Sequence, residues 1–283
     1  MEKRKGETRT LGGKAAIFCA IFALGAATIG SASADGADEK NANTEIRRGP
    51  FIVRADFDLT PLEGELRELD ALVDEMTRTF RLPKTRENVV VRIFRDEATW
   101  RDYWNREFGS LPFRRALYDR KNYLFDRDGA NGRVYLCVNP LFANDLRHEC
   151  AHAILAATLG RSVPIWLDEG IAEYFEQPPE SRLTNETWRS ATVERLRRGE
   201  FSTLESLEKL SSMNEMTVVK YCDSWAWVCW FLNGPDAVRD VLPQYLNDLA
   251  SRKLFAPKPS KRVKAIAKDG AAERSLRRFY GAL

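Results

Sequence analysis

The spacing of apolar residues predicts a mixture of strands and helices in the first half of the chain. Phe51–Phe57 alternates in the manner of a strand, and Asn88–Phe94 (NVVVRIF) is a run of β-branched and apolar residues, so both are predicted to be strands. Pro61–Phe80 repeats apolar residues every three or four positions, which predicts a helix. Glu97–Phe108 is predicted to be a second helix.

Two more strands, Asn122–Phe125 and Arg133–Val138, are predicted to form a hairpin around a turn at 128–132 (DGANG). The pattern beyond them is helical. The predicted helices are Leu141–Leu159, Pro164–Phe175, Thr184–Arg198, Leu204–Leu210, Val218–Leu232 and Pro235–Leu249. Because strands and helices mix early and helices dominate late, the predicted fold class is α+β. A lobe of sheet and helices spans 51–180, a helical lobe spans 181–251, and a cleft lies between them.

The first 34 residues have the composition of a targeting segment. A basic stretch ends at Lys14, the apolar run Ala15–Ile29 follows, and small residues occupy 31–34. This order is typical of a secretory signal peptide, so we predict that residues 1–34 are cleaved after Ala34 and that the protein is exported, either periplasmic or secreted. An uncleaved anchor is the weaker alternative, because a full span takes roughly 20 apolar residues. Residues 35–50 are polar and are predicted to be a flexible lead-in.

The distribution of charge argues against a nucleic-acid partner. The formal net charge is +3, but without the five basic and two acidic residues of 1–34 the chain holds 39 of each sign and is formally neutral. Residues 252–283 form a basic C-terminal segment, with ten Lys and Arg against Asp269 and Glu273. This segment is expected to make at most weak contact with anionic envelope components.

Four cysteines lie beyond the predicted signal peptide: Cys137, Cys150, Cys222 and Cys229. In an oxidising compartment they are compatible either with one or two disulfides or with four buried thiols. If Cys222 and Cys229 share one helix, they stand about 10 Å apart along its axis and cannot pair with each other.

The chain contains only two histidines, and both belong to the motif His148-Glu149-Cys150-Ala151-His152. Within the predicted helix, residues four apart lie one above the other, so both imidazoles can reach one metal ion. Glu149 projects beside that ion, where it can take a proton from a metal-bound water. This HExxH pattern predicts a Zn²⁺ site with His148 and His152 as ligands and Glu149 as general base.

The third ligand is expected to be a carboxylate, or with less support a cysteine, because a catalytic zinc takes three protein ligands and no third histidine exists. The next predicted helix carries Glu169, Glu173 and Glu176 on one face, and Asp168 projects elsewhere. Glu169 is favoured, since Gly170 beside it leaves no side chain between closely packed backbones. Glu173, one turn later, is suited to accept a hydrogen bond from the outer ring nitrogen of a ligand histidine.

The motif and the segment Pro164–Glu176 (PIWLDEGIAEYFE) resemble the gluzincin metallopeptidases, in particular the peptidase MA-like group of exported bacterial proteins. The resemblance implies a zincin-like fold, Glu169 as the third ligand and Glu173 as the carboxylate that supports a ligand histidine. The segment that begins at Tyr221 (YCDSWAWVCWFL) is similar to a Tyr-x-x-Gly helix of the aminopeptidase branch, which implies that the Tyr221 hydroxyl stabilises an oxyanion. Ser224 stands where that branch commonly has glycine, and Asp168 replaces the group's usual asparagine.

These observations predict an exported zinc-dependent metallopeptidase that hydrolyses peptide or protein substrates with a zinc-activated water. Two alternatives remain: a zinc-stabilised envelope binding module with little turnover, and an amidase that acts on non-peptide bonds of cell-wall material. A structural zinc site needs no general base and usually closes with a fourth protein ligand, so Glu149 favours an enzyme.

Overall fold

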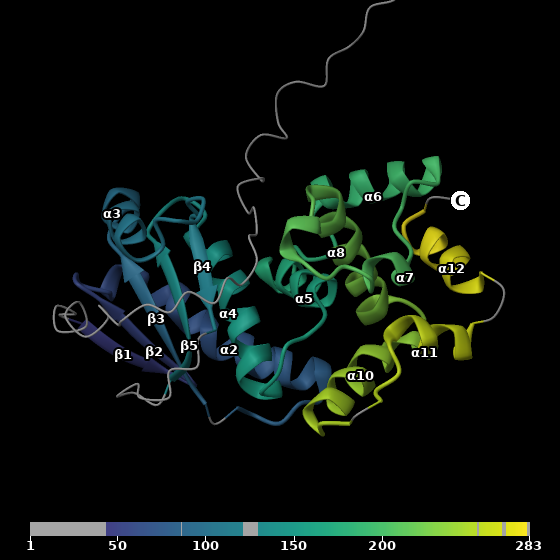
Figure 1. The fold of residues 1–283 in the computed structure, drawn as a ribbon, viewed down its shortest axis with the longest axis horizontal. Coiled ribbons are helices and arrows are strands. Elements are labelled where there is room, and N and C mark those ends of the chain that lie inside the picture. The colour runs from purple at the N-terminus through teal and green to yellow at the C-terminus, as the bar shows by residue number, and fades with distance from the viewer. Residues whose placement is uncertain (1–43, 86, 121–129, 254, 268–269, 282–283) are drawn as a thin grey trace, which may run out of the picture.

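The computed structural model describes residues 44–85, 87–120, 130–253, 255–267 and 270–281, in which a mixed five-stranded sheet stands beside a group of helices (Figure 1). The strands are β1 (Thr44–Arg48), β2 (Phe51–Ala55), β3 (Asn88–Phe94), β4 (Ala116–Asp119) and β5 (Ala130–Cys137). Their order is β1-β2-β3-β5-β4, with parallel β2–β3 and β3–β5 pairs and antiparallel outer pairs. The predicted α+β class is confirmed.

Alternating side chains of the sheet enter two different apolar clusters. Val91 and Leu136 are buried in the main core, together with residues of α2 (Glu63–Phe80) and α4 (Phe142–Leu159). Their chain neighbours on the opposite face, such as Tyr135, pack in an aromatic cluster with α3 (Glu97–Glu107). Both faces of the sheet are therefore covered, which explains why its strands are more continuously apolar than a half-exposed strand would be.

The remaining helices extend the main core away from the sheet. They are α5 (Ile165–Glu176), α6 (Glu186–Arg198), α7 (Leu204–Leu207), α8 (Val218–Asn233), α9 (Asp236–Arg239), α10 (Val241–Ala250), α11 (Pro259–Ile266) and α12 (Ala271–Phe279). Helix α4 contacts β4, β5 and α2 on one side and α5 on the other, and α5 in turn packs against α8. The helix that carries the histidine motif is thus held from several sides.

Gly170 lets two helix backbones approach closely, and the partner of α5 at this point is α8. A Cβ at Gly170 would lie 2.7 Å from the backbone oxygen of Ser224, so the close contact joins α5 to α8 and not to the preceding helix α4. A backbone oxygen cannot rotate away as a side-chain end can, and α8 would have to shift.

We expect Gly170→Ala to destabilise the protein by about 1–3 kcal/mol, because overpacking a close contact forces the backbone to move. The midpoint of thermal unfolding should fall by about 2–4 °C for each kcal/mol. Gly64→Ala is the matched control: nothing lies within 4 Å of a Cβ at this position of α2, and the gain in helix propensity should leave stability unchanged or raised. Equal melting temperatures for the two variants would contradict the packing of α5 on α8.

Several boundaries differ from the predicted ones. Residues 44–48 of the predicted lead-in form β1, an edge strand that pairs with β2; its one apolar residue, Ile46, gave too weak a pattern to be recognised. The strand that pairs with β5 is β4, whereas the predicted strand at 122–125 lies outside the described residues, as do residues 1–43 with the predicted signal peptide. The predicted helix 235–249 is two helices, α9 and α10.

The C-terminal basic segment contains two helices, α11 and α12. All four cysteines beyond residue 34 are buried free thiols, in agreement with one of the two expected states. Within the described part of the chain, no helix combines the length and apolar character that crossing a membrane requires.

Candidate metal centre

Three side chains on α4 and α5 bring one ligand atom each to a common point. Nε2 of His148 and Nε2 of His152 lie 3.3 Å apart, and Oε2 of Glu169 lies 3.8 Å from the first and 3.6 Å from the second. All three side chains are buried. The residues predicted as ligands are therefore together in space.

The size of this triangle fits a zinc ion. Ligand atoms at about 2.0–2.1 Å from a tetrahedral zinc lie roughly 3.4 Å from one another, close to all three distances. Oε2 of Glu169 has no hydrogen-bond partner among the described residues, although it is buried. A buried carboxylate oxygen without a partner is costly, and a bound cation would satisfy it.

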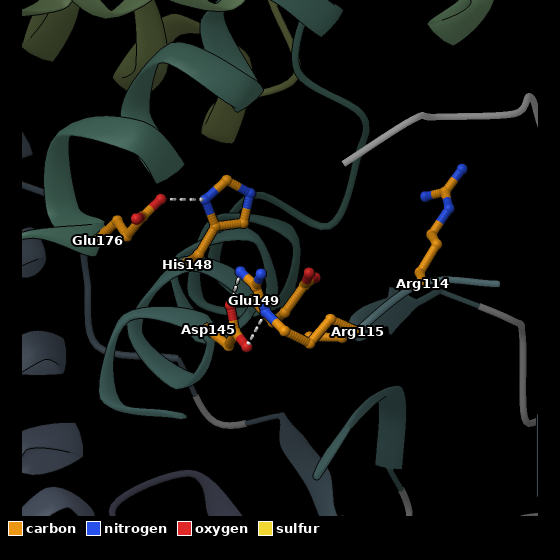
Figure 2. A pocket seen from close by; sticks show the side chains of 7 residues that line it. Arg114, Arg115, Asp145, His148, Glu149 and Glu176 are labelled. Carbon is orange, nitrogen blue, oxygen red and sulfur yellow. Dashed lines mark hydrogen bonds and ion pairs between the residues drawn. The ribbon is translucent and has the colours of Figure 1, made fainter. Parts of the chain in front are cut away.

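Each histidine has its second ring nitrogen, Nδ1, next to a carboxylate. The carboxylate is Glu176 for His148 and Asp168 for His152. Nδ1 of His148 lies 3.3 Å from Oε2 of Glu176; a carboxylate only accepts, so Nδ1 donates and Nε2 keeps its lone pair for a metal (Figure 2). Nδ1 of His152 lies 3.1 Å from Oδ1 of Asp168, at an angle outside hydrogen-bond geometry. Both contacts favour the tautomer that a zinc ligand needs.

Glu173 does not take the position expected of it. Its Oε2 accepts a hydrogen bond from Nε1 of Trp188 on α6, at 3.0 Å. The structure places Glu176, one turn further along α5, on His148. Spacing along the helix could not separate the two, because both share the face of Glu169. Burial and the neighbouring Glu176 raise the pKa of Glu173 to about 8, so this carboxyl carries a proton at neutral pH.

Two arginines hold the elements of the site in register. Arg147 is buried and donates to the backbone oxygens of Phe175 and Gln177 at the C-terminal end of α5 (3.0 and 3.4 Å). Arg115, just before β4, forms a two-point ion pair with Asp145 in the first turn of α4, with both N···O distances 2.5 Å (Figure 2). These contacts tie α4 to α5 on one side and to the sheet edge on the other.

Glu149 faces a small cavity beside the ligands. The cavity measures about 30 Å³, room for one or two water molecules, and its lining includes His148 and Arg115 (Figure 2). Glu149 is buried, and this burial raises its pKa against the opposing charges of the two histidines. A carboxyl with a raised pKa next to a water-sized space is suited to exchange protons with that water.

Tyr221 reaches the same region from α8. Its hydroxyl is buried and has no hydrogen-bond partner within the described residues. Burial raises the pKa of this phenol, and the charge of Glu169 raises it further, so the hydroxyl keeps its proton and remains a donor. The predicted role of Tyr221 requires such a protonated, unpartnered hydroxyl.

Zinc uptake is expected to compete with protons. Burial alone would lower the pKa of His148, but Glu176 and other carboxylates outweigh it and raise the pKa to about 9 in the metal-free protein. The ligand nitrogen must be free of its proton to bind zinc, so apparent affinity should rise with pH up to about 9, by about tenfold per unit for each proton released. Calorimetric titration with zinc in buffers of different ionisation enthalpy measures this release; uptake without proton release would contradict the assigned ligands.

Comparison with known proteins found no match, either to a family model or to a curated protein.

Proposed function

We propose that the protein is an exported zinc-dependent metallopeptidase of the gluzincin type, with a zincin-like fold and its active site between the sheet-bearing lobe and the helical lobe. The observation that supports it most strongly is the buried triangle of His148, His152 and Glu169, with Glu149 facing a water-sized cavity beside it. A structural zinc site has no use for a second acidic group, such as Glu149, that is not a ligand.

The proposed reaction assigns one task to each side chain. His148, His152 and Glu169 would hold a zinc ion, which would supply a Lewis acid and lower the pKa of a water. Glu149 takes a proton from the attacking water and returns it to the leaving amine nitrogen, which its raised pKa favours. Tyr221 donates its hydroxyl hydrogen to the substrate oxygen as negative charge develops there. Glu176 and Asp168 keep the two imidazoles oriented.

Elemental analysis of the purified full chain and of His148→Ala tests the proposal. We expect about one zinc per chain in the wild type and none in the variant, together with cleavage of members of a peptide library by the zinc-loaded wild type alone. One zinc without cleavage of any peptide would favour the binding module or the cell-wall amidase. Absence of metal from both proteins, even after incubation with zinc, would refute the metal site.

A further inference from the structure

Arg114 is a cation at the rim of the site that the proposed reaction leaves without a task. It contributes to the wall of the same cavity as Glu149 and His148. Its Nε is buried and has no hydrogen-bond partner in the part of the chain that the structure describes. The neighbouring Arg115 reaches toward Asp145, whereas Arg114 extends away from it (Figure 2).

The backbone of Arg114 is fixed, although Nε of its side chain has no hydrogen-bond partner among the described residues. Nε1 of the buried Trp100 donates to the backbone oxygen of Arg114 at 2.8 Å. The next residue, Arg115, is held by its ion pair with Asp145. A guanidinium on such an anchored segment loses little conformational freedom on binding, which is a requirement for a recognition group.

Arg114 brings a buried donor to the wall of the cavity that Glu149 and His148 also line. Its Nε therefore lies beside the place where substrate would meet the metal.

We propose that Arg114 recognises a carboxylate of the substrate close to the bond that is cut. A guanidinium pairs with a carboxylate through two parallel hydrogen bonds, a geometry that a neutral carbonyl cannot match. Three of the other charged groups around the metal have partners: Asp145 is paired with Arg115, Glu176 with His148 and Asp168 with His152. The inference rests on the proposed zinc site and adds to it a preference for acidic substrates.

The test uses the zinc-loaded full chain and two matched probes, the monohydroxamate of succinic acid and its primary amide. Both bind zinc through the hydroxamate, and only the first carries a carboxylate. We expect calorimetry to show that the wild type binds the acid about 10- to 100-fold more tightly than the amide, because a hydrogen bond to a charged group is stronger than a neutral one. Arg114→Gln should remove this difference, and Arg198→Gln, the same change at an exposed position of α6, should keep it.

Equal binding of both probes to the wild type, or a preserved preference in Arg114→Gln with full zinc content, would overturn the inference. If Arg114→Gln lowers kcat equally for peptides with and without a carboxylate, Arg114 acts on the reacting oxygen and the specificity role is wrong. Failure of the proposed function would give a different result, because a protein that holds no zinc would bind neither hydroxamate. The inference about Arg114 would then be wrong as well. The recognised carboxylate could belong to the peptide C-terminus or to a glutamate side chain. To identify it, KM is compared among peptides with a free or an amidated C-terminus, each with and without a neighbouring glutamate.

Discussion

Replacing Glu149 with glutamine should lower kcat by at least about 10²–10⁴-fold and leave one zinc per chain in place. The amide has nearly the same shape as the carboxyl, so the buried wall of the cavity should be preserved. It cannot take the proton of the attacking water, however, and cannot return one to the leaving amine. The loss should therefore appear in kcat and not in zinc content, measured by peptide hydrolysis and elemental analysis on the same sample.

Glu149→Asp is the matched control for this substitution. It keeps the acidic group but draws it back by one methylene, so its activity should lie between the wild type and the glutamine variant. Thermal unfolding of the variants shows whether the fold has changed. Full activity in Glu149→Gln with zinc bound would show that another group accepts the proton and that the role of Glu149 is wrong.

The sequence was sufficient to predict the centre of the site because helix geometry fixes it locally. His148 and His152 lie four residues apart on one helix, and the distance between their Nε2 atoms follows from that spacing. Glu169 was favoured over the neighbouring carboxylates because Gly170 follows it and because the resemblance to gluzincins implies it. The structure places its Oε2 3.8 and 3.6 Å from the two histidine nitrogens. The strands in the middle of the sheet, such as β3, were also predicted, since burial on both faces leaves an unmistakable apolar run.

The features of the site that could not be predicted from the sequence depend on how separate elements pack against each other. The choice between Glu173 and Glu176 rests on Trp188 of α6, whose indole donates to Glu173 and leaves Glu176 to His148. The contact between Gly170 and Ser224 depends on α8, fifty residues away along the chain. The role of Arg114 was not recognised either. Nothing in the local sequence shows that Arg115 is paired with Asp145 whereas Nε of Arg114 has no partner among the described residues.

Among the carboxylates of α5, Glu169 is the one whose replacement is expected to have the largest effect on metal binding. Glu169→Ala removes one of three ligand atoms from a buried site and leaves two histidines with no carboxylate oxygen opposite them. We expect its zinc affinity to fall by more than about 100-fold, beyond the 10- to 100-fold loss typical of changes to the partners of ligands. Competition with a chromogenic chelator at fixed pH measures this affinity.

Two further variants on α5 decide which carboxylate supports the histidine. Glu176→Gln takes the negative charge away from Nδ1 of His148 and should weaken zinc binding by about 10- to 100-fold. Glu173→Gln should change it little, because a carboxyl with a pKa of about 8 is already protonated at neutral pH and the amide oxygen can still accept from Trp188. We expect zinc affinity to be weakest in Glu169→Ala, intermediate in Glu176→Gln and near the wild type in Glu173→Gln. This order follows from the group that each carboxylate faces: the metal position for Glu169, His148 for Glu176 and Trp188 for Glu173. The reverse order for Glu173 and Glu176 would return the supporting role to Glu173, as the resemblance to gluzincins implies. Retention of one tightly bound zinc in Glu169→Ala would move the third ligand to Asp168, Glu173 or a cysteine.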